Sequence, residues 1–421
     1  MYGHKRIFLI GWAWFACWSL VTGFSYSSNI KFFAICRALQ GIGPALLVPN
    51  AIALIGRTFP VGEKRNLAFA CFGAAGPTGA TAGAVFMALL TDLAWWPWGF
   101  WILAIACTMA AGAAHLIIQD SDAKFGSKTT ERQAFDYWGC ITGVTGLILV
   151  NFALNQAPLV TWANPYIGSI LGIGILFLGA FIWVELYVTA NPLIPLRGLQ
   201  KEAIIALACI FSGWASHGIW AYYLYLFLEH LRGHSALLTS AETSPVAITG
   251  VLFAISTVWL IKRIRVNYIM LIAMGFFTLG SLLLALMPIK QTYWSLTFIS
   301  VLIMPGAMNL SFPAATILLS AALPKEKQGI AASLVSTMVN YSISCGLGLA
   351  GTIDRYLIEK EARKRGIEGN PAPIHKVDAE TQAIRLVGLR GAYWFAVALS
   401  AFGMLIAASY IFVSRKSSTK A

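Results

Sequence analysis

The sequence is dominated by apolar runs of about 20 residues, which recur along almost its whole length. Each run is long enough to cross a hydrocarbon core of about 30 Å as an α-helix. A helix satisfies all its backbone polar groups internally, as lipid requires, whereas spanning strands would be short and alternating. With 58% hydrophobic residues, 11% charged residues and a mean hydropathy of +0.72, the chain is too apolar for a soluble protein. We therefore predict an all-α integral membrane protein.

The runs predict about twelve transmembrane helices in a multi-pass arrangement. They are Ile7–Tyr26, Phe32–Ile55, Leu67–Leu90, Trp96–Ile118, Tyr137–Gln156, Ile167–Tyr187, Ala203–Leu228, Val246–Leu260, Ile269–Met287, Trp294–Ala321, Ile330–Ile353 and Ala392–Val413.

Clusters of Lys and Arg fall on alternate connections, as at Arg57–Arg65 and Lys262–Arg265. The positive-inside rule makes that side cytoplasmic and predicts that both termini are cytoplasmic. The segment from Asp354 to Arg390 is then a long outside loop. We expect a helix-like charged stretch at Glu361–Gly366 and a Pro-rich break at Asn370–Ile374, with no binding site in this loop.

The net charge of +13 does not indicate a nucleic-acid partner, because the basic residues lie in short clusters between apolar runs. The seven cysteines fall inside apolar runs without CxxC spacing, so we interpret them as packing residues. No nucleophile–base arrangement, metal cluster or phosphate-binding loop stands out. The sequence predicts no enzymatic activity, no cofactor and no metal.

Arg37 is the clearest charged residue inside a predicted span. A buried Arg costs on the order of 2.5–3.5 kcal/mol in a membrane, so function or a hydrogen bond must hold it there. Gln40 follows three residues later on the same helical face. Arg37 and Gln40 are candidates for proton coupling or the substrate path; the alternative is that Arg37 extends to the lipid interface.

The run Arg37–Gly43, with the sequence RALQGIG, resembles the Arg-x-x-Gln-Gly-x-Gly motif of the fourth span in major-facilitator transporters. That resemblance implies a role in proton transfer. The later run Gly73–Gly83 resembles the fifth-span antiporter motif. Gly76 and Pro77 are present, Gly73 is one residue closer to them than the motif has it, and Gly79 and Gly83 replace the terminal glycine pair. Small residues and a proline also allow close helix packing and a kink, independently of any antiport role.

The stretches Gly306–Ile317, Gly329–Ser342 and Trp95–Trp101 are similar to spans of fungal aminotriazole-resistance-type transporters. The implied family is the fourteen-span branch of drug:proton antiporters, with a major-facilitator helical bundle. On that alignment, residues 1–118 hold four spans of the first half, 119–202 hold two linking spans, and 203–421 hold the six-span second half. The family's first two spans are then missing, through a real truncation or an error in the gene assignment, and its first-span acidic residue is missing with them.

Polar and aromatic residues inside spans are candidates for a substrate cavity. Trp214 and His217 lie at helical spacing with Tyr225 further along the same face, and His217 is titratable near neutral pH. His217 is thus a candidate proton carrier, although a lone His in a helix is more often a packing residue. Asn151, Asn155, Asn309 and Asn340 are further cavity candidates, with hydrogen bonding between helices as the alternative.

These features predict a secondary active transporter that exports small molecules or drugs by alternating access, with protons as the coupling ion. Its expected partners are the lipid bilayer and a small-molecule substrate, and we expect a monomer in the plasma membrane rather than the vacuole. Two alternatives stay open. One is a facilitator or importer of a small polar solute such as ammonium or borate; the other is a non-transporting remnant or membrane sensor.

Overall fold

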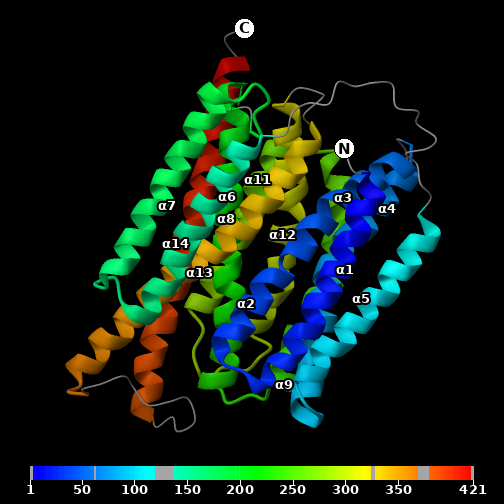
Figure 1. Ribbon diagram of the computed structural model, residues 1–421. Helices are drawn as coiled ribbons and strands as arrows, with labels where there is room; N and C mark the ends of the chain where they lie inside the picture. The colour runs from blue at the N-terminus through cyan, green and yellow to red at the C-terminus, as the bar shows by residue number, and fades with distance from the viewer. Residues whose placement is uncertain are drawn as a thin grey trace. The chain divides into compact units, whose positions relative to one another are not determined.

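The computed structural model describes residues 3–60, 63–118, 136–194, 196–198, 200–323, 328–367 and 379–418, and these residues are almost entirely helical (Figure 1). They divide into two compact units, Met1–Gln133 (unit 1) and Ala134–Ala421 (unit 2). The two predicted linking spans therefore belong to the same compact unit as the C-terminal helices.

Unit 1 contains five α-helices in its described part: α1 (His4–Gly23), α2 (Ile30–Gln40), α3 (Ile42–Thr58), α4 (Glu63–Leu93) and α5 (Pro97–Ile117), with the short η1 (Phe24–Ser27) after α1. Helix α1 packs against both α3 and α5. A Cβ on Gly43 of α3 would lie 2.6 Å from Cβ of Phe15 on α1, so only glycine allows this approach.

Unit 2 begins with the paired helices α6 (Tyr137–Val160) and α7 (Pro165–Trp183), followed by η3 (Val184–Val188) and η4 (Leu196–Gly198). The remaining elements are α8 (Lys201–Leu226), η5 (Phe227–Leu231), α9 (Ala236–Thr243), α10 (Pro245–Ile261), α11 (Val266–Ala285), α12 (Leu296–Ala321), α13 (Gln328–Lys364) and α14 (Ala379–Ser418). Helix α8 contacts α11, α12, α13 and α14. The apolar window of α8 and η5 is 67% buried, against 17% for α7 and η3, so α8 is central to the core of unit 2.

Local sequence signals explain where several helices begin. Asn29 accepts a hydrogen bond from the backbone N–H of Phe32 at the start of α2 (3.1 Å), and Asp136 accepts one from Gly139 at the start of α6 (2.8 Å). Pro97 and Pro165 occupy the first position of α5 and α7, where their missing N–H costs no hydrogen bond.

Ten segments among the described residues are long and apolar enough to cross a membrane. They correspond to ten of the twelve predicted spans. The other two predicted spans, Leu67–Leu90 and Ile330–Ile353, coincide with the helices α4 and α13. Along its described residues α4 contributes the shorter apolar helix Thr78–Leu93, and α13 is not among the ten segments.

The prediction of a long loop from Asp354 to Arg390 was wrong for most of that segment. Helix α13 continues to Lys364 and α14 begins at Ala379. Ion pairs at i,i+4 spacing support the extension of α13, with Arg355 Nε 2.9 Å from Glu359 Oε1 and Arg365 Nη2 3.1 Å from Glu361 Oε1. The predicted helical character of Glu361–Lys364 is therefore confirmed, whereas Asn370–Ile374 lies outside the described residues.

Candidate functional site

Arg37 and Gln40 form the predicted pair on one face of α2. Arg37 Nη1 donates to Gln40 Oε1, and Gln40 Nε2 donates to Ser19 Oγ on α1. The Arg37 guanidinium also lies 5.7 Å from the centre of the Phe100 ring on α5. We call Ser19, Arg37, Gln40 and Phe100 the Arg37 cluster. Gln40 is 1% exposed whereas Arg37 is exposed, so the buried amide anchors a charge that remains accessible.

The helix breaks directly after this pair, at Gly41. One continuous span was predicted over Phe32–Ile55, and the structure divides it into α2 and α3. Pro44 has no N–H to donate to the carbonyl of Gln40 four residues earlier, so the hydrogen-bond ladder is interrupted there. The motif thus places Arg37 in the last turn of a short helix.

His217 lies on α8 among aromatic rings. Its ring stacks on Trp220 with centroids 5.7 Å apart and planes at 20°, and it meets the edge of Trp214 at 5.4 Å. Phe277 of α11 is 6.4 Å away. We call Trp214, His217, Trp220 and Phe277 the His217 cluster. His217 Nδ1 is buried and has no hydrogen-bond partner among the described residues.

Serine side chains of α12 fix the two indoles of this cluster. Trp214 Nε1 donates to Ser311 Oγ (3.1 Å) and Trp220 Nε1 donates to Ser300 Oγ (2.7 Å). Both indole N–H groups are therefore satisfied at membrane depth, where an unpaired donor is costly. His217 differs from the two indoles, because its Nδ1 has no hydrogen-bond partner among the described residues.

The predicted asparagines fall into two kinds. Asn155 Nδ2 on α6 lies 3.0 Å from Asn151 Oδ1 and also reaches the Ser344 carbonyl of α13 at 3.2 Å. Asn309 and Asn340 instead donate to carbonyls four residues earlier in their own helices, at 2.9 and 2.8 Å. Pairing between helices is therefore observed for Asn155 and not for the amides of Asn309 and Asn340.

Tyr225 does not join the His217 cluster. Its hydroxyl lies 2.9 Å from Thr243 Oγ1 on α9, which ties the end of α8 to that short helix. Among the described residues no group of three or more His, Cys, Asp or Glu could hold a metal ion.

Comparison with known proteins decides the family. Residues 1–349 match the Major Facilitator Superfamily. The chain belongs to this superfamily.

Relatives and solved structures agree with the assignment. The chain is 45% identical over 412 residues to the low affinity ammonium transporter of Saccharomyces cerevisiae, covering 97% of this chain and 76% of the relative. It is 37% identical over 407 residues to efflux pump terJ of Aspergillus terreus, covering 96% and 74%. A crystal structure of a POT family transporter superposes with a TM-score of 0.66 at 14% identity, covering 99% of this chain and 82% of the other.

The predicted resemblance to aminotriazole-resistance-type transporters is confirmed, since an aminotriazole resistance protein of Saccharomyces cerevisiae is 32% identical over 98% of this chain. Membership of a transporter superfamily indicates a membrane transporter rather than an enzyme. The ten apolar helices of the described part fit an integral, multi-pass major-facilitator protein.

The glycines of the antiporter-like motif lie on α4, which is helical throughout Glu63–Leu93. A Cβ added at Gly76, Gly79 or Gly83 would meet no atom within 4 Å. Within the described part of unit 1, therefore, no helix approaches closely at these three positions. The antiport role of the motif, including Gly73 and Pro77, stays a prediction.

Sequence reasoning missed Asp354 as a buried carboxylate, because it counted this residue as part of a loop. Asp354 Oδ1 is buried without a hydrogen-bond partner in the described part of the chain. It lies against Gly388 of α14, where a Cβ would collide with it. Burial raises the pKa of Asp354 to about 6, against the opposing effect of nearby Arg385. Its position directly after an apolar run was the signal available in the sequence.

Proposed function

We propose that this chain exports small amphiphilic molecules across the plasma membrane by proton-coupled secondary transport. The observation that carries the proposal is the similarity to fungal efflux pumps over nearly the whole chain, as for terJ at 37% identity. Both termini are cytoplasmic in this proposal, because the basic connections alternate along the sequence.

The His217 cluster supports a place for the substrate on α8. Aromatic faces bind apolar and cationic groups of many shapes, which suits a pump of broad specificity. His217 would carry the coupling proton, since imidazole is a titratable group and its Nδ1 has no partner among the described residues. In unit 1, Arg37 would take part in proton transfer, as its motif implies.

A transport assay tests this proposal. The chain is expressed in a yeast host that lacks its own drug pumps, and efflux of a preloaded fluorescent cationic amphiphile is measured with and without a protonophore. We expect faster efflux than in empty-vector cells and loss of the difference with the protonophore. Efflux equal to the empty vector would refute export.

Variants of His217 test its proton role. His217→Phe keeps an aromatic ring without a titratable nitrogen and is expected to make efflux independent of the proton gradient. His115→Phe on α5 is the matched control, because His115 is exposed and outside both clusters. Retention of full proton dependence in His217→Phe would exclude His217 as the carrier.

Ammonium uptake is the second candidate, favoured by the 45% identity to a low affinity ammonium transporter. Purified protein in lipid vesicles distinguishes the two. A facilitator should conduct methylammonium without a pH gradient, whereas a proton-coupled exporter should not.

A further inference from the structure

A second polar site lies at the helix ends of unit 2. It is a cavity of about 530 Å³ whose wall combines the end of η5, helix α9, the α11–α12 connection and the start of α14. Its lining residues include Arg232, His234, Glu242, Lys290, Gln291 and Tyr293. None of the residues that line it belongs to the His217 cluster.

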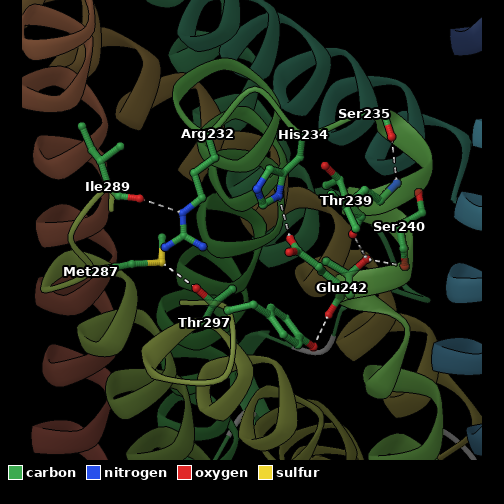
Figure 2. A network of polar contacts seen from close by, with 12 residues as sticks. Arg232, His234, Ser235, Thr239, Ser240, Glu242, Met287, Ile289 and Thr297 are labelled. Carbon is green, nitrogen blue, oxygen red and sulfur yellow. Dashed lines mark hydrogen bonds and ion pairs between the residues drawn. The ribbon is translucent and has the colours of Figure 1, made fainter. Parts of the chain in front are cut away.

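Hydrogen bonds and an ion pair hold the walls of this cavity in place (Figure 2). Arg232 Nε donates to the carbonyl of Ile289 (3.1 Å), which fixes the η5–α9 segment against the α11–α12 connection. His234 Nδ1 lies 3.1 Å from Glu242 Oε2, and the Tyr293 hydroxyl donates to the carbonyl of Glu242 (2.7 Å). The walls are therefore organised before any ligand binds, which lowers the entropic cost of binding.

The cavity has unused hydrogen-bonding groups of both kinds. Arg232 Nη1 has no hydrogen-bond partner among the described residues, and Lys290 is exposed, so the lining offers positive charge to a ligand. Glu242 uses only Oε2 in its ion pair with His234. Gln291 Oε1 is buried and has no partner in the described part of the chain, while its Nε2 donates to Ser295 Oγ (2.7 Å).

Arg232 and Tyr293 keep their protons at neutral pH and so remain hydrogen-bond donors in the cavity wall. Burial lowers the pKa of Arg232, but the nearby Glu242 carboxylate opposes that effect, and the guanidinium stays charged. Burial and the Glu242 charge together raise the pKa of Tyr293 to about 12, so its hydroxyl remains a donor at neutral pH.

We propose that this cavity binds a small zwitterion, a molecule with one carboxylate and one ammonium group, such as a free α-amino acid. The carboxylate pairs with Arg232 and Lys290, and the ammonium group donates to Glu242 Oε1 and Gln291 Oε1. A simple anion would leave Gln291 Oε1 unsatisfied and would face Glu242, and a simple cation would face Arg232 and Lys290. This site goes beyond the proposed export function, because it is separate from the His217 cluster.

Direct binding to the purified chain in detergent tests the ligand class. Isothermal titration compares leucine with leucinamide, which lacks the carboxylate, and with 4-methylpentanoate, which lacks the ammonium group. We expect saturable leucine binding and affinities weaker by about tenfold or more for both analogues. The absence of leucine binding, or equal affinity for either analogue, would overturn the proposal.

Variants then assign the cavity. Lys290→Gln and Glu242→Gln should each weaken leucine binding by about tenfold. Lys262→Gln is the matched control, because Lys262 is also exposed but lies in the α10–α11 connection and not in the cavity wall. Lys290 makes no ion pair in the described part of the chain, so its variant should keep the wild-type melting temperature.

Unchanged leucine affinity in a folded Lys290→Gln protein would place the site elsewhere. The His217→Phe variant separates this proposal from the export proposal. It should bind leucine like the wild type even if its transport is altered.

Discussion

The two units hold their polar membrane residues in different ways. In the Arg37 cluster of unit 1, the charge is hydrogen-bonded to Gln40, which is hydrogen-bonded in turn to Ser19 on a second helix. In unit 2, His217 is held by stacked and edge-on rings, and its Nδ1 has no partner among the described residues.

The difference follows from the cost of leaving each group unpaired. A guanidinium is always charged, so it needs acceptors wherever lipid surrounds it. An imidazole is able to become neutral, and aromatic packing then compensates for a missing hydrogen bond. The contrast suggests that unit 1 holds a fixed charge, whereas unit 2 holds titratable groups with an unpaired polar atom among the described residues. His217 is one such group, and Asp354, directly after the predicted span Ile330–Ile353, is the second. Four predictions test this contrast, from the largest expected effect to the smallest.

Replacement of Asp354 by Asn should have the largest effect, and the effect should depend on pH. The folded pKa of about 6 lies above the ordinary value of 3.8, so folding favours the protonated acid. The stability contributed by that proton is fully present below pH 3.8 and is lost as the pH rises through 6. Two pKa units correspond to about 3 kcal/mol, so wild-type stability should fall by that order between pH 4 and 7.

Thermal unfolding in detergent across this pH range measures the effect. Asp354→Asn should abolish the fall, whereas Asp92→Asn, at an exposed position of α4, should retain it. A wild-type protein with pH-independent stability, or an Asp354→Asn protein with the wild-type fall, would show that Asp354 is charged and satisfied in the fold.

Gln40→Leu should lower the free energy of unfolding by about 2 kcal/mol, because it removes two hydrogen bonds, one of them to a charge. Gln156→Leu on α6 is the matched control, since the Gln156 side chain makes no hydrogen bond among the described residues, and it should leave stability unchanged. The free energy of unfolding is measured by denaturant titration in micelles. Equal stability of Gln40→Leu and the wild type would mean that Arg37 does not depend on this amide.

The sequence predicts only those members of each cluster that lie on the same helix. Arg37 with Gln40 and Trp214 with His217 are separated by three residues, so a single helix period brings them together. Ser19 lies 21 positions from Gln40 in the chain, and nothing in its own helix marks it as the partner. Contacts between helices depend on how the helices pack, which a periodic pattern does not specify.

The length of the helices was less predictable than the number of spans. Hydropathy marks where a chain enters lipid, and it stops at Ile353 of α13. The helix itself continues to Lys364, because the charged residues after Ile353 are paired along its solvent-exposed turns. The polar cavity was not predicted either, because its walls come from distant parts of the sequence: Arg232 and Ile289, which a hydrogen bond joins, lie 57 residues apart.

Ser311→Ala should lower the free energy of unfolding by about 1 kcal/mol, because it leaves the buried Trp214 Nε1 without an acceptor. Ser256→Ala on α10 is the matched control. The Ser256 hydroxyl is exposed and bonds only to the carbonyl of Leu252 in its own helix, so its removal should be neutral. The measurement is the same denaturant titration. If both variants lose the same stability, the indole is satisfied by another group.

His217→Phe should have the smallest effect on stability, although His217 is central to the proposed transport. The wild-type imidazole already has an unpaired Nδ1, so a phenyl ring removes no hydrogen bond at that atom and keeps the stacking on Trp220. We expect a change within about 0.5 kcal/mol. His217→Ala should instead cost about 2 kcal/mol or more, because it opens a cavity between the two indoles. If His217→Phe were as unstable as His217→Ala, the imidazole would be held by a polar contact, as Arg37 is, and the contrast between the units would fail.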